Sequence, residues 1–368
     1  MKLREITQIL EQVAPLFYQE SYDNSGLITG NNELEVSKVL LCLDCLESIV
    51  DEAIEKGCKL IIAHHPIVFS GLKKLNGKNY IERVIIKAIK NDIAIYACHT
   101  NLDNVLKNGV NQKIAEKIGL ENIQILSPMA NRMSKLIVYC PSDKLEIVEK
   151  VRENLFANGG GHISDYSNCS FNLEGKGTYL PGESTNPAYG DKGKTNFMDE
   201  TKIEVIVMNQ EANRIVTEVN KVHPYEEVAY EIIPMANVNK QLGAGIIGDL
   251  KEGMETEKFL SHLKSSMKTE CIRHTNIHKE KVIKIAVCGG SGSFLLDAAK
   301  GNKADVFVTG DYKYHQFFDA EDKIIIADIG HYESEQFTIE LFEDILKDKI
   351  SGVELIKTIV NTNPVNYC

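Results

Sequence analysis

The sequence predicts an α/β protein in which a domain with a mixed or largely parallel sheet is built from both chain ends and interrupted by an α+β insert. Three observations predict this. Short apolar segments alternate with amphipathic helical segments in the first third of the chain, which is typical of βαβ units. The alternation stops near residue 127, where a polar, glycine-rich region begins. After residue 243, apolar strand segments return.

The first segment, residues 1–129, supplies strands and helices in turn. Its expected strands are short and continuously apolar, as buried strands are, and comprise residues 38–43, 60–63 and 93–97. The expected helices have amphipathic spacing and comprise residues 3–17, 47–56, 81–90 and 110–118.

The middle segment, residues 130–237, has a different order of elements. It predicts, in turn, a strand at 135–140, a helix at 144–156, a strand at 202–207, a helix at 211–222 and a strand at 227–233. Residues 158–194 are rich in glycine and polar side chains and predict a long ordered loop with short strands. This order indicates a ferredoxin-like unit.

The last segment, residues 238–368, resumes the α/β pattern. Expected strands cover 282–288, 305–308 and 323–327, and a helix covers 334–346. The simplest topology is one domain formed by the two outer segments. The glycine loop 289–293 lacks the spacing and the lysine of nucleotide-binding loops, so a tight turn and an anion-binding loop both stay open.

The composition limits the class of protein. The 368 residues are 43% hydrophobic and carry a formal charge of −11 without a basic patch, which argues against nucleic acid as a partner. No secretory or membrane-spanning apolar run is visible. Nine scattered cysteines indicate reduced thiols and a cytoplasmic location. The pair Cys42 and Cys45 has no second CxxC partner and is interpreted as buried thiols rather than a zinc ribbon.

Two adjacent histidines, His64 and His65, stand where an apolar strand ends. Pro66 cannot continue a central strand, so the imidazoles lie beyond a strand's carboxyl end, where α/β sheets bind ligands. Neighbouring side chains of extended backbone point in opposite directions, so the two rings are expected to serve different ions. Taken alone, the pattern also fits an ordinary strand end.

Two further strand ends carry residues that bind metals. Residues 98–104 follow the strand at 93–97 and include His99 and Asp103. His331 and Glu335 follow the strand at 323–327 and share one helix face if a helix begins near His331. Imidazole and carboxylate ligands without thiolate fit zinc, iron or manganese.

In combination, these residues resemble the Nif-three-like dinuclear-metal family, also called GTP cyclohydrolase 1 type 2 homologues. The motifs that carry the resemblance are Asp23-Asn-Ser-Gly-Leu27, Ala63-His-His-Pro-Ile-Val-Phe-Ser-Gly-Leu72, His99-Thr-Asn-Leu-Asp103, Thr309-Gly-Asp311 with His315, and Asp328-Ile-Gly-His-Tyr-Glu-Ser-Glu335. The middle segment resembles the PII/CutA-like insert of long bacterial members through Gly159-Gly-Gly-His-Ile-Ser164 and His223-Pro-Tyr-Glu-Glu-Val-Ala229.

The resemblance implies two metal ions per subunit inside a toroidal homohexamer, and the donor set makes zinc the first expectation, with iron or manganese as alternatives. The ligands that it implies are His64, His65, Asp103, His331 and Glu335. Glu335 is our candidate for the carboxylate that bridges the two ions. His99 and His315 are candidates for orienting the ligands or transferring protons, with ordinary core histidines as the alternative.

Three functions remain open at this point. The first is a metal-dependent hydrolase that attacks a nucleotide or a phosphorylated or cyclic small molecule with hydroxide held between the ions. The second is a non-catalytic regulatory or metal-handling module. The third is a GTP cyclohydrolase, although no residue set in the sequence specifies purine recognition.

Overall fold

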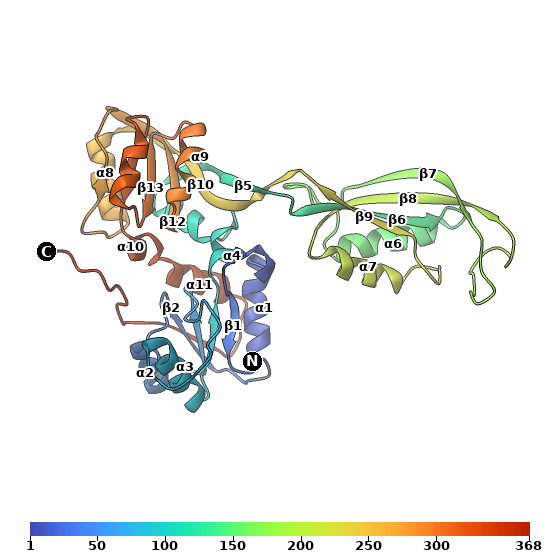
Figure 1. Ribbon diagram of the computed structural model, residues 1–368, viewed down its shortest axis with the longest axis horizontal. Coiled ribbons are helices and arrows are strands. Elements are labelled where there is room, and N and C mark those ends of the chain that lie inside the picture. Colours follow the sequence, from blue (N-terminus) through green and yellow to red (C-terminus); the bar gives the residue numbers. More distant parts are fainter. The chain divides into compact units, whose positions relative to one another are not determined.

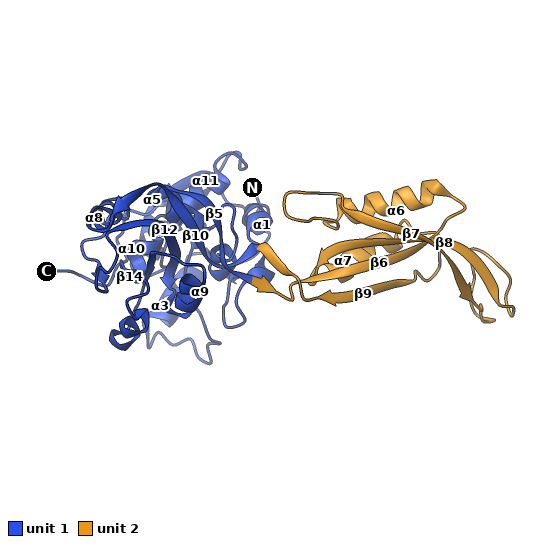
Figure 2. Cartoon of the chain, turned by 90° about the horizontal axis from the view of Figure 1, so that it is seen from above, with its two compact units in different colours: residues 1–128, 241–368 blue, residues 129–240 orange.

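The computed structural model describes residues 1–368, which divide into two compact units (Figure 2). Unit 1 comprises Met1–Pro128 and Gln241–Cys368, so both chain ends build it. Unit 2 is the middle segment, Met129–Lys240. The predicted α/β class is confirmed. None of the helices has the length and apolar character needed to span a membrane.

The first sheet of unit 1 combines strands of the N-terminal segment with one C-terminal strand (Figure 1). Its order is β1 (Gly26–Thr29), β4 (Ala94–Ala97), β3 (Leu60–Ala63), β2 (Lys38–Cys42) and β15 (Glu354–Lys357). All neighbours are parallel except β1 with β4. The helices of this part are α1 (Leu3–Val13), η1 (Leu16–Tyr18), α2 (Glu47–Lys56), α3 (Tyr80–Lys90), α4 (Thr100–Asp103) and α5 (Val110–Ile118).

The second sheet of unit 1 has a parallel centre with antiparallel neighbours. Its order is β11 (Arg273–His274), β14 (Ile325–Asp328), β13 (Val306–Gly310), β12 (Lys281–Ser291), β10 (Val238–Glu255) and β5 (Leu120–Ala130). β12, β13 and β14 are parallel, whereas β10 and β11 are antiparallel to their partners β12 and β14. The remaining helices of unit 1 are α8 (Thr256–Ser266), η2 (Ser293–Leu295), α9 (Leu296–Gly301), η3 (Tyr314–Ala320), α10 (His331–Glu335) and α11 (Thr338–Leu346). Of these, α11 contacts β2 and β15 of the first sheet.

The outer segments thus form one compact unit with two sheets, where a single sheet was the simplest expectation. In each sheet, three parallel strands that follow one another in the chain lie side by side. They are β2, β3 and β4 in the first sheet and β12, β13 and β14 in the second. Apolar strand patterns predict parallel pairing, but they do not say which strands share a sheet.

Close packing holds the strand ends of the first sheet in place. Every residue of β3 and β4 is buried, as expected for strands covered on both faces. Leu40, Ile61 and Ile95 pack against Ile49 of α2 and Val84 of α3. Burying a side chain of this size stabilises the fold by roughly 1.5–3 kcal/mol. His64 and His65 therefore leave a rigid strand.

Unit 2 has a β-α-β-β-α-β order, in which β7 lies within the stretch that was expected to be a long loop with short strands. Its sheet order is β7 (Ser170–Tyr179), β8 (Asn196–Met208), β6 (Met133–Pro141) and β9 (Tyr230–Met235), with antiparallel neighbours. The core of the unit lies between this sheet and the helices α6 (Leu145–Ala157) and α7 (Ala212–Asn220). The ferredoxin-like prediction is confirmed by this topology.

Three local predictions need correction. Part of the expected loop at 158–194 is the ten-residue strand β7, an edge strand that is too exposed to show an apolar alternation. The first helix ends at Val13 because Pro15 disfavours helical backbone just before it. The expected helix at 334–346 is two shorter ones, α10 and α11, interrupted at Gln336 and Phe337.

Candidate metal centre

Metal-binding side chains converge in unit 1 from strand ends of both sheets. His64 and His65 directly follow β3, and Asp103 ends α4, which follows β4. His331 and Glu335 are the first and last residues of α10, which follows β14. A cavity of about 1090 Å³ is lined by His65, Asp103, His331 and Glu335, among others. The structure therefore brings the five ligands implied by the resemblance together.

The first donor group consists of His65, His331 and Glu335. Glu335 Oε2 lies 2.9 Å from His65 Nε2 and 3.1 Å from His331 Nε2. The two Nε2 atoms are 3.3 Å apart. In a tetrahedral site with bonds of about 2.0–2.1 Å, ligand atoms stand roughly 3.3–3.4 Å apart. The three atoms are thus close to the spacing of ligands around one ion.

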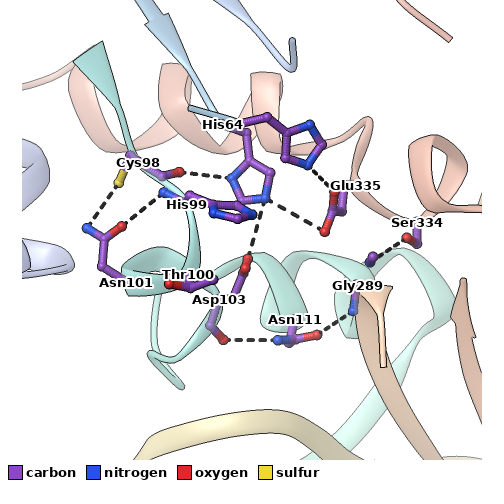
Figure 3. A network of polar contacts seen from close by, with 12 residues as sticks. His64, Cys98, His99, Thr100, Asn101, Asp103, Asn111, Gly289, Ser334 and Glu335 are labelled. Carbon is purple, nitrogen blue, oxygen red and sulfur yellow. Dashed lines mark hydrogen bonds and ion pairs between the residues drawn. The ribbon is translucent and has the colours of Figure 1, made fainter. Parts of the chain in front are cut away.

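The second donor group consists of His64, Asp103 and the other oxygen of Glu335 (Figure 3). His64 Nε2 lies 3.6 Å from Asp103 Oδ1 and 3.7 Å from Glu335 Oε1. Both His64 Nε2 and Asp103 Oδ1 are buried without a hydrogen-bond partner. Because an unsatisfied buried polar atom costs about 1–3 kcal/mol, a cation between these atoms would remove a real penalty. The donor set fits a metal ion.

Glu335 joins the two groups. Its side chain is 4% exposed, with Oε1 toward His64 and Oε2 toward His65 and His331. This is the arrangement that a carboxylate needs in order to serve two ions at once.

Each histidine of the centre is oriented through its Nδ1 atom. His64 Nδ1 donates to the carbonyl oxygen of Cys98 at 2.9 Å, which leaves Nε2 for an ion. Carboxylates hold the other rings: Asp44 binds His65 at 2.7 Å, Asp23 binds His99 at 2.8 Å and Asp311 binds His331 at 2.7 Å. Such outer partners fix the tautomer and raise the basicity of the ligand nitrogen.

Sequence reasoning assigned no role to these three aspartates. A signal was present for two of them, because Asp44 follows β2 by two residues and Asp311 directly follows β13. An aspartate one or two residues after a predicted parallel strand is therefore a candidate partner for a metal-binding histidine. Asp23 lies in the loop before β1, where nothing in the local sequence indicates its partner.

The two predicted catalytic histidines have different surroundings. A ring nitrogen of His99 lies within 4.8 Å of nitrogens of His64 and His65, and the His99 ring lines the cavity. His315 lies on η3 with an exposed side chain that packs against Tyr314 and Phe318. It is not among the residues that line the cavity, so its role in proton transfer stays a prediction.

Burial, neighbouring charges and hydrogen bonds shift the pKa values of three ionisable groups of the centre. Burial opposes the charged form of His65, but hydrogen bonds with Asp44 and Glu335 raise its pKa to about 10. Burial and the negative charge of Glu335 raise the pKa of Asp103 to about 7. Although burial opposes ionisation, hydrogen bonds from the histidines hold the pKa of Glu335 well below its usual value.

Zinc binding should release protons at neutral pH. Both ring nitrogens of His65 lie within hydrogen-bond distance of carboxylates, so a ring that binds no ion carries two protons, and an ion at Nε2 must displace one. Calorimetric titration in buffers with different ionisation enthalpies should give different observed enthalpies, and the affinity should rise with pH as protons compete less. Heats that do not depend on the buffer would contradict this assignment.

The glycine loop at 289–293 packs against Glu335 rather than offering its amides to an anion. The N–H groups of Gly289, Gly290 and Gly292 donate to side chains of Asn111, Ser334 and Thr309, respectively. A Cβ atom on Gly290 would lie 2.5 Å from Glu335 Oε1. The absence of a side chain at Gly290 therefore makes room for the shared carboxylate.

Comparisons with known proteins agree with this geometry. Residues 1–364 match the family described as Duf34/NIF3 (NGG1p interacting factor 3). Two curated relatives are each named "GTP cyclohydrolase 1 type 2 homolog". The one from Halalkalibacterium halodurans is 40% identical over 98% of both chains. The one from Bacillus subtilis is 36% identical over 99% of this chain and 98% of its own.

Solved structures point the same way. A Bacillus cereus protein related to NIF3 has a TM-score of 0.85 and 36% identity over 100% of this chain and 99% of its own. A Staphylococcus aureus protein has a TM-score of 0.77 and 32% identity with the same coverage. With the match extending over nearly the whole sequence, the chain belongs to the Duf34/NIF3 family.

Proposed function

We propose that this protein is a metal-dependent hydrolase with two divalent ions, acting on a nucleotide or a phosphorylated or cyclic small molecule. The observation that carries the proposal is the pair of donor groups that share Glu335 at one cavity. Zinc suits the imidazole and carboxylate ligands best, with iron or manganese as alternatives. The homohexamer implied by the family resemblance and a cytoplasmic location belong to the same proposal.

The roles of the chain's own residues follow from their contacts. When bound, the ions would supply Lewis acidity, positive charge and activation of water. His99 is the candidate for moving a proton to the leaving group, because its Nδ1 is held by Asp23 and its ring lines the cavity. Asp23 keeps the Nε2 of that ring available.

Arg273 is the residue best placed for an anionic part of the substrate. It is the one lysine or arginine among the residues that line the cavity. Its side chain is 56% exposed and paired with Asp328, and its Nη2 donates to the carbonyl oxygen of Tyr312 at 2.9 Å. This anchoring holds the guanidinium in place, and fixed guanidinium groups suit phosphate.

The name of the two curated relatives favours a second candidate, cleavage of GTP by a cyclohydrolase reaction. The cavity lining contains exposed aromatic side chains, such as Phe69 and Phe294, that a purine ring could contact. GTP therefore belongs in any substrate panel. A non-catalytic regulatory or metal-handling hexamer is the alternative if no substrate turns over.

The test is turnover of phosphoesters, cyclic nucleotides and GTP by protein loaded with one defined metal at a time. We expect His99→Ala to keep both ions and lose most of its turnover, because neither of the two donor groups that share Glu335 includes His99. His315→Ala tests the other histidine in the same assay. If no substrate exceeds the background of a Glu335→Gln variant with any metal, the hydrolase proposal fails and the regulatory reading is preferred.

A further inference from the structure

The C-terminal segment, defined here as residues 358–368, passes from the first sheet to the metal centre. It begins directly after β15 and has no regular secondary structure (Figure 1). Asn363, Pro364, Val365 and Tyr367 all line the cavity. This part of the chain is therefore a wall of the candidate site.

Thr362 is linked to a candidate metal ligand through one carboxylate. Its hydroxyl donates to Asp44 Oδ2 at 2.6 Å, and Asp44 Oδ1 accepts from His65 Nδ1 at 2.7 Å. The opposite nitrogen of the same ring, Nε2, lies 2.9 Å from Glu335 Oε2. Thr362 is 7% exposed, so water competes little for this hydroxyl. The hydrogen bonds form a continuous path from the segment to the ion position.

The next residue reaches the other side of the centre. Asn363 Nδ2 donates to Glu333 Oε1 at 2.9 Å, and Glu333 lies on α10 between His331 and Glu335. Two consecutive residues thus contact Asp44, the hydrogen-bond partner of His65, and the helix that carries His331 and Glu335.

We propose that Thr362 is a positioning residue for the ion position formed by His65, His331 and Glu335. Its hydroxyl holds the Asp44 carboxylate in the rotamer that orients the His65 ring, so that Nε2 points at the ion. The position formed by His64 and Asp103 has no such link, because His64 Nδ1 donates to the backbone at Cys98. The inference rests on the proposed binding of two ions.

Substitutions in the C-terminal segment distinguish a residue that positions the His65 ring from one that only holds the segment in place. Thr362→Val keeps the shape and removes the hydroxyl, whereas Thr362→Ser keeps the hydroxyl. The matched control is Thr358→Val, which removes a hydrogen bond from the same segment to Glu52, on α2. Glu52 contacts none of the residues in the two donor groups.

The experiment is calorimetric titration of the full-length, metal-free protein with zinc. We expect Thr362→Val to weaken one of the two binding steps several-fold, less than the roughly 10- to 100-fold typical of losing a direct partner of a ligand such as Asp44, while the other step is unchanged. Thr362→Ser and Thr358→Val should behave as wild type. Asp44→Asn should weaken the same step, and adding Thr362→Val to it should change little, since the hydroxyl acts through Asp44.

Wild-type affinities for both ions in Thr362→Val would overturn the proposal, and so would equal losses in the Ser and Val variants or in Thr358→Val. Additive losses in the Asp44 double variant would also overturn it. Failure of the wild-type protein to bind zinc is a different result, because it would refute the proposed function together with this inference.

Discussion

Replacing Glu335 with glutamine should remove both ions. The two oxygens of Glu335 face different donor groups, and the amide retains one neutral oxygen and presents hydrogen-bond donors where the other stood. The variant keeps the volume of a buried side chain, so the fold should persist. Metal analysis after reconstitution should show the occupancy of both positions falling together.

The matched control for this change is Glu340→Gln on α11, a carboxylate that pairs with Lys117 and contacts none of the donors. It should bind as much metal as wild type. If Glu335→Gln loses one ion and keeps the other, Glu335 is a terminal ligand of one position. Retention of both ions would refute its role as a ligand.

The second large effect should come from Gly290→Ala. The backbone at Gly290 has a φ of +59°, which costs an L-residue roughly 1–2 kcal/mol. The new Cβ would also lie 2.5 Å from Glu335 Oε1 and 3.2 Å from His331 Cε1. Overpacking of this kind costs about 1–3 kcal/mol. The clash is relieved only by moving the shared carboxylate, so metal affinity should fall even where the protein stays folded.

Thermal unfolding and zinc titration of the same preparation measure the two parts of this effect. Gly301→Ala, at the end of α9, is the control, because a Cβ there meets no atom within 4 Å. It should leave both the midpoint of unfolding and the zinc affinity close to wild type. A Gly290→Ala protein with wild-type zinc affinity would show that the loop does not constrain Glu335.

The sequence predicted the candidate ligands because they stand next to strand and helix patterns that can be recognised locally. Short apolar runs mark β3, β4 and β14, and the residues just after them carry the candidate ligands. Because carboxyl ends of parallel strands are where α/β sheets bind ligands, each of these positions was a candidate, whereas their meeting across two sheets was not predictable. The spacing of His331 and Glu335 also anticipated a helical turn, which is α10.

The parts that could not be predicted depend on long-range contacts. Nothing local says that β2 to β4 and β12 to β14 form separate sheets, or that β15 joins the first of them. The hydrogen bond between Thr362 and Asp44 spans 318 positions in the chain. The glycine loop was ambiguous for the same reason, because the partners of its amides come from three other segments.

The most direct test of the account is the metal content of the wild-type protein. Purified protein should be stripped with a chelator, reconstituted separately with zinc, manganese and iron, freed of excess metal and measured by elemental analysis. The paired donor groups, with Glu335 shared between them, predict close to two equivalents per chain with at least one of these metals. A metal content near zero with all three metals would contradict the proposal that the chain binds two divalent ions.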